Sequence, residues 1–120
     1  MKNEIEIMQE LLANYQMIKT IKNDDGYIIH RVATIGRDSI KLLNNLKIYN
    51  DDDTVIEEAI SELKNIDSIE KSYYSDHQYK KWVKKENSFG NFRIFLEAIN
   101  CVEGSLEVFL FNKRWLRQKN

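Results

Sequence analysis

Residues 3–22, NEIEIMQELLANYQMIKTIK, decide the fold class more firmly than any other stretch of this sequence. Apolar side chains recur there at steps of three and four, the spacing that gathers them on one face of an α-helix. They are Ile7, Met8, Leu11, Leu12, Tyr15, Ile18 and Ile21. The stretch therefore predicts a long amphipathic helix that buries one side against the rest of the chain.

Composition favours helices elsewhere as well. The chain has no proline and only four glycines, so the residues that most often interrupt helices are nearly absent. Hydrophobic residues make up 42% and charged residues 31% of the sequence, a balance typical of globular proteins. We therefore predict one all-α domain over residues 1–120, built as a bundle of roughly four to six helices.

The segment from residue 27 to residue 50 leaves two interpretations open. Its apolar residues suit a helix, but Gly36 stands among them and Asp38 and Ser39 can cap a new N-terminus, so one bent helix or two short ones are expected. Around Gly36 the sequence also resembles a degenerate helix-turn-helix, in which Arg37 and Lys41 would contact nucleic acid.

Two further helices follow from the pattern. Residues 50–54, NDDDT, form an acidic helix start, because carboxylates there meet unpaired backbone N–H groups. The apolar stripe after it is Val55, Ile56, Ala59, Ile60 and Leu63. Residues 73–85 suit a polar helix that carries aromatic side chains.

The chain beyond residue 91 fits either a helix or a β-hairpin. Apolar residues from Phe92 to Val102 have helical spacing, and so, less regularly, do those that follow. The same residues also alternate, and residues 102–105, VEGS, can form a turn. We favour the helix; the alternative is a C-terminal hairpin from about residue 92, which would make the fold α+β.

The formal net charge of −1 conceals an uneven distribution. Residues 1–70 hold 8 Lys/Arg and 14 Asp/Glu, a net −6, while residues 71–120 hold 10 and 5, a net +5. Two basic segments of the second half also carry aromatic residues, residues 79–85 and 111–119. Such segments either pack their aromatic rings on the core or bind an acidic partner or nucleic acid.

Catalytic and metal-binding patterns are missing from the sequence. Cys101 is the single cysteine, His30 and His77 are the two histidines, and they show no zinc-ligand spacing. The run Asp51 to Asp53 lacks the spacing of a calcium loop and is better explained as a helix start. There is no phosphate-binding glycine loop either. We expect no enzyme activity, no cofactor and no metal, with Cys101 a buried thiol.

These observations lead to a functional expectation. We predict a cytoplasmic, non-catalytic regulatory, inhibitory or accessory protein that binds another protein and does not enter membranes. The candidate contact residues are Lys81, Trp82, Lys85, Arg114, Trp115 and Arg117. The alternative is a regulator that binds nucleic acid through the basic aromatic segments, or through Arg37 and Lys41. A homodimer is also compatible with a short bundle rich in aromatic residues.

Overall fold

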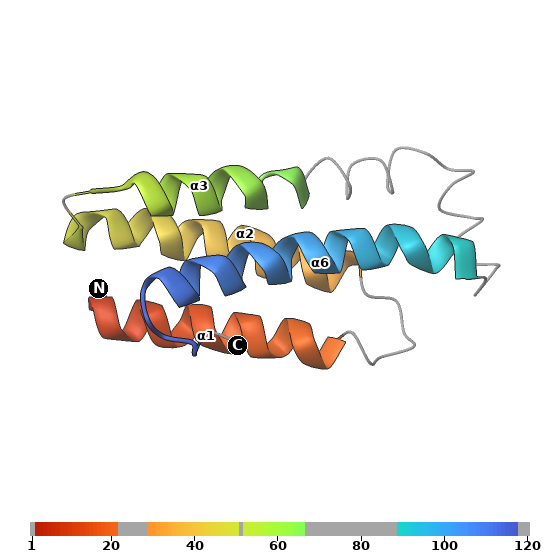
Figure 1. Cartoon of the computed structure of the whole chain (residues 1–120), viewed down its shortest axis with the longest axis horizontal. Helices are drawn as coiled ribbons and strands as arrows, with labels where there is room; N and C mark the ends of the chain where they lie inside the picture. The colour runs from red at the N-terminus through yellow and green to blue at the C-terminus, as the bar shows by residue number, and fades with distance from the viewer. Residues whose placement is uncertain (1, 22–28, 51, 67–88, 118–120) are drawn as a thin grey trace.

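The fold is seen in a computed structural model that describes residues 2–21, 29–50, 52–66 and 89–117. These ranges contain α1 (Glu4–Ile21), α2 (Ile29–Leu46), the 3₁₀ helix η1 (Lys47–Tyr49), α3 (Thr54–Leu63) and α6 (Phe89–Asn112), with no strand among them. The predicted all-α bundle is confirmed. Helices α2 and α6 contact each other and both outer helices, α1 and α3 (Figure 1).

Helix α1 has the face that its sequence predicts. The side chains of Ile7, Leu11 and Ile18 are fully buried, and Tyr15 is nearly so. The helix starts at Glu4 because Asn3 caps it: the Asn3 side-chain oxygen accepts the backbone N–H of Glu6 at 2.9 Å, and the Asn3 amide donates to the Glu6 carboxylate at 3.1 Å. The first bond satisfies one of the backbone N–H groups that a helix start leaves free, and the second holds the Asn3 side chain in the capping position.

A small polar network links α1 to α2 inside the interface. The buried Asn14 amide donates to Asp38 Oδ2 and to Ser39 Oγ, both at 3.0 Å. The Ser39 hydroxyl in turn donates to the carbonyl of Ile35 at 2.7 Å. Since a buried polar group needs its partners, this network favours one register of α1 against α2.

Helix α2 is continuous through Gly36, so the helix-turn-helix interpretation and the division into two short helices are wrong. Gly36 is buried, and a Cβ placed on it would lie 3.0 Å from Ile66 Cγ2 and 3.5 Å from Val102 Cγ2. The glycine therefore serves close packing of α2 against α6 and against the chain just after α3, and not a turn.

Helix α3 begins where the acidic run predicts. Asp52 Oδ1 accepts the backbone N–H of Thr54 at 3.0 Å and its hydroxyl at 2.6 Å. The predicted stripe is buried at Ile56, Ala59, Ile60 and Leu63, and Val55 packs partly against it. The expected helix at residues 73–85 lies outside the described residues.

The segment beyond residue 91 belongs to helix α6, so the hairpin alternative is wrong. It begins at Phe89 and continues through residues 102–105, which would have formed the turn. A strand from Leu106 to Leu110 would bury Val108 together with its two neighbours at alternate positions. Instead Leu106, Phe109 and Leu110 are buried while Val108 is 57% exposed, which is helical periodicity.

None of the helices in residues 2–21, 29–50, 52–66 and 89–117 is long and apolar enough to cross a bilayer.

Candidate binding surface at the C-terminal end of α6

The chain turns back sharply where α6 ends. The backbone N–H of Trp115 donates to the carbonyl of Leu110 at 2.8 Å, and that of Arg114 donates to the carbonyl of Phe111 at 3.0 Å. This pair of bonds defines a Schellman motif, in which the residue between the last helical turn and the returning chain adopts the left-handed conformation. Arg114 is that residue, with φ of 64°.

Arginine is an unfavourable residue at this position. Glycine usually occupies it because it has no Cβ, whereas an L-residue in the left-handed region costs about 1–2 kcal/mol. Among the described residues, Arg114 is the one non-glycine residue with positive φ. The fold therefore keeps a strained arginine at the end of its longest described helix.

The returning chain carries a half-buried aromatic residue and two exposed arginines within four positions. Trp115 and Leu116 are half-buried and pack against the hydrophobic core, while Arg114 and Arg117 are exposed. In the part of the chain that the structure describes, neither guanidinium has an ion-pair or hydrogen-bond partner. We call Arg114, Trp115 and Arg117 the arginine surface.

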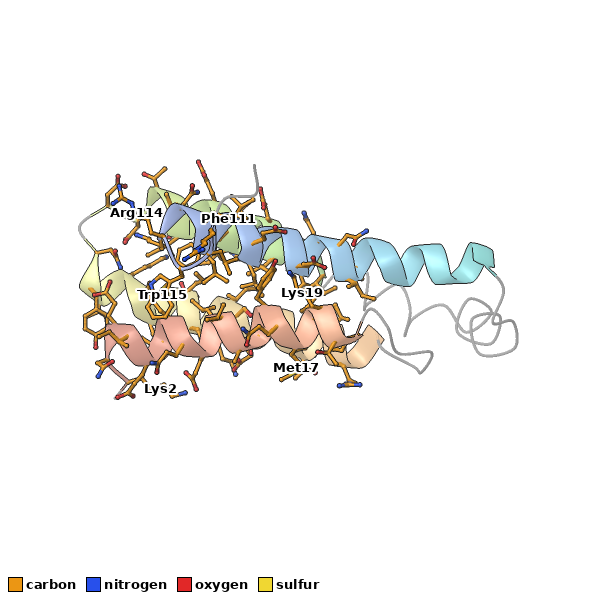
Figure 2. All side chains as sticks on the ribbon, turned by 60° about the horizontal axis from the view of Figure 1, so that its bottom comes forward. Lys2, Met17, Lys19, Phe111, Arg114 and Trp115 are labelled. Atoms are coloured by element: carbon orange, nitrogen blue, oxygen red, sulfur yellow. The ribbon has the colours of Figure 1, made fainter. Side chains whose placement is uncertain are left out.

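Two other segments end beside the arginine surface. Lys113 Nζ donates to Asn50 Oδ1 at 3.2 Å, which connects the end of α6 to the residue after η1. The Tyr49 hydroxyl donates to the carbonyl of Lys2 at 3.0 Å, which connects η1 to the start of α1. Figure 2 shows Lys2, Arg114 and Trp115 at this same end of the bundle.

A pocket that sequence reasoning missed lies at this end. It has a volume of about 470 Å³, opens to solvent, and is lined by Lys2, Glu6, Ile7, Asn45, Ile48 and Tyr49. Ile48 is 64% exposed and Tyr49 40% exposed, although both follow directly on a buried helix. The sequence held one indication of this exposure: Ile48 does not continue the apolar spacing of α2.

Two of the lysines at this end have acidic neighbours. Two hydrogen bonds from Thr54 lower the pKa of the Asp52 carboxyl, and the nearby charge of Lys113, from the basic half of the sequence, lowers it further. Lys47 of η1 forms an ion pair with Glu57 of α3, within the acidic half. Since Lys113 and Lys47 have such neighbours, Arg114 and Arg117 are the cations of this end best placed to meet another molecule.

The remaining predicted site residues are less informative. Lys81, Trp82 and Lys85 lie outside the described residues. Arg37 and Lys41 lie one turn apart in the middle of α2, and Lys41 is exposed.

The Cys101 thiol is the one candidate nucleophile from the sequence analysis that lies among the described residues. Cys101 is half-buried rather than buried, and its Sγ donates to the carbonyl of Glu62 at 3.4 Å. Burial raises the pKa of the Cys101 thiol, and the nearby Glu62 carboxylate raises it further, so the nucleophilic thiolate is disfavoured. No cluster of metal-ligating side chains occurs among the residues that the structure describes.

Comparison with known proteins adds no family to these observations: no family model, no curated protein and no solved structure matches the chain. The fold and the arginine surface therefore define the molecule only as a small all-α bundle with a cationic, aromatic helix end.

Proposed function

We propose that this protein is a non-catalytic regulatory, inhibitory or accessory factor that binds another protein through the arginine surface. Aromatic residues and arginines are the side chains most enriched in the energetically dominant centres of protein interfaces. Here the backbone of a half-buried tryptophan is held in place by the Schellman motif, and exposed arginines stand beside it in the sequence at positions 114 and 117. The partner surface expected from this chemistry carries carboxylates around an apolar patch.

The strained conformation of Arg114 is the observation that carries the proposal. Strain of this kind persists where the surrounding structure enforces it, and it often marks positions used for function. The simpler explanation is that a cation near a helix C-terminus interacts with the helix dipole, which contributes about 0.3–1 kcal/mol. Lys113 already supplies such a cation without positive φ, so the dipole alone does not account for arginine at position 114.

The test compares two double variants of the tagged full chain in a pull-down from cells of its source. Arg114→Gly with Arg117→Ala removes both cations of the arginine surface. Lys19→Ala with Lys64→Ala removes the same charge from exposed positions on α1 and after α3, neither of which is a candidate contact. Captured proteins are quantified by mass spectrometry, with and without nuclease treatment of the lysate.

We expect one protein or a defined complex to be captured by the wild-type chain and by the lysine variant, but not by the arginine variant. Equal capture by all three chains would refute the arginine surface as the binding site. Capture that disappears after nuclease treatment would refute a direct protein partner and favour the nucleic-acid alternative, whose affinity should fall steeply with salt.

A further inference from the structure

The sequence after α6 contains no residue that normally ends a helix. Residues 113–117, KRWLR, all have ordinary helix propensities, and the chain has no proline and no glycine beyond Gly104. Helix α6 nevertheless ends at Asn112. The helix must therefore be ended by contacts with the rest of the chain, and not by its local sequence.

The backbone hydrogen bonds of the turn would be replaced, not lost, if the helix continued. In the structure, the N–H of Trp115 donates to the Leu110 carbonyl and that of Arg114 donates to the Phe111 carbonyl. In an α-helix each N–H bonds to the carbonyl four residues earlier, so these two donors would exchange the same two carbonyls. Helix α6 also ends before the end of the bundle that α1 and α2 reach (Figure 1), so a continued helix would first run beside them.

Two opposing effects decide between the turn and a longer helix. The turn holds Arg114 in the left-handed region with φ of 64°, which is unfavourable for a residue with a Cβ, and a continued helix removes that penalty. In return, the turn packs Trp115 and Leu116 against the core, where both are half-buried. Because partial burial stabilises a side chain less than full burial does, the packing exceeds the strain by a small margin.

Helical periodicity shows where a longer α6 would direct these two side chains. Leu116 follows the buried Phe109 by seven residues, which is about two helical turns, and would keep facing the core. Trp115 follows Val108 by the same interval, and the Val108 side chain is 57% exposed. Continuation of the helix would therefore move the Trp115 ring from the core to the outer face of α6.

We propose that the segment after Asn112 has two forms in solution: the turned form seen in the structure, and an extended form in which α6 continues through residue 117 and Trp115 leaves the core. The arginine surface exists only in the turned form, because the extended form takes the Trp115 ring away from the core contacts that hold it. A partner bound to the arginine surface would therefore favour the turned form. That last step alone rests on the proposed function, since the two forms belong to the free chain.

The test follows residues 113–117 of the free full chain by NMR relaxation dispersion, which detects a minor form that exchanges in microseconds to milliseconds. We expect exchange at these residues, with helical α-carbon shifts at Arg114 in the minor form. Arg114→Gly removes the left-handed penalty and should lower the ratio of extended to turned form roughly fivefold to thirtyfold. Arg114→Val should raise the ratio, because a β-branched residue tolerates positive φ poorly. Asn112→Gly is the matched control: this position is exposed and helical in both forms, so the ratio should not change.

Absence of exchange at residues 113–117 of the wild-type chain would overturn the proposal, as would a minor form without helical shifts at Arg114. So would an Arg114→Gly chain that keeps the wild-type ratio, or an Asn112→Gly chain in which the ratio changes as much as Arg114→Gly is expected to change it. No partner is present in this measurement, so its outcome is separate from that of the pull-down. A chain with a single form can still capture a partner, and a chain with two forms can fail to do so.

Discussion

The backbone N–H of Trp115 is hydrogen-bonded to the carbonyl of Leu110 at 2.8 Å, and this bond brings the Trp115 side chain back against the core. Arg114, between the helix and the returning chain, is forced into the left-handed region as a result. The same turn therefore anchors the aromatic ring and exposes the two arginines.

Replacing Arg114 with glycine should stabilise the fold. Relief of the left-handed strain outweighs the greater unfolded-state entropy of glycine, so we expect a gain of about 0.5–1 kcal/mol in unfolding free energy. Urea denaturation followed by circular dichroism measures it. Arg114→Val is the counterpart: a β-branched residue tolerates positive φ poorly, and its stability should drop below that of the wild type. A glycine variant less stable than the valine variant would contradict this description of the turn.

The two helix-interior glycines should respond oppositely to alanine. Gly36→Ala brings a methyl group to 3.0 Å from Ile66 Cγ2, and overpacking of this kind costs about 1–3 kcal/mol. Gly104→Ala meets no described atom, so the better helix propensity of alanine should stabilise the fold by about 0.5–1 kcal/mol. Thermal unfolding compares the two variants; a destabilised Gly104→Ala chain would contradict the open space at this position.

The polar network between α1 and α2 should contribute measurable coupling. Asn14→Ala removes both donors that reach Asp38 and Ser39, and we expect a loss of about 1–2 kcal/mol. Ser39→Ala and the double variant complete a thermodynamic cycle, with an expected coupling of about 0.5–1.5 kcal/mol. Strict additivity of the two single changes would mean that the hydrogen bond has no energetic role.

The Cys101 thiol should react slowly with alkylating reagents. Because burial and the Glu62 carboxylate raise its pKa, the thiolate fraction at a given pH is lower than for an exposed cysteine. The rate of iodoacetamide labelling should therefore rise at a higher pH than it does for the chain unfolded in urea. Coincident pH profiles for the folded and unfolded chain would contradict the half-buried placement of this thiol.

The sequence predicted helices correctly where the apolar residues fit helical spacing and no other pattern. α1 begins one residue into the stretch predicted from residue 3, where apolar spacing is regular, and α3 begins at Thr54, the last residue of the predicted acidic start. Around Gly36 the apolar spacing fitted either one helix or two, and beyond residue 91 it fitted either a helix or a hairpin. Only tertiary contact decides whether a glycine makes a turn or a close approach, and only burial decides whether Val108 belongs to a strand or a helix.

The candidate surface was predictable in composition but not in geometry. Arg114, Trp115 and Arg117 stand out as a basic aromatic segment in the sequence alone. The Schellman turn could not be predicted from the sequence, since arginine does not normally occupy the left-handed position of this motif. Ile48 and Tyr49 were missed because a short 3₁₀ helix after α2 redirects them toward solvent.

The most direct test of the arginine surface is the affinity of the Arg114→Gly chain for the captured partner, measured by titration calorimetry against the wild-type chain. Because this substitution is expected to stabilise the fold, lost binding could not be attributed to unfolding. The account predicts at least a tenfold weaker dissociation constant, equivalent to about 1.4 kcal/mol. An unchanged dissociation constant in a well-folded Arg114→Gly chain would contradict it.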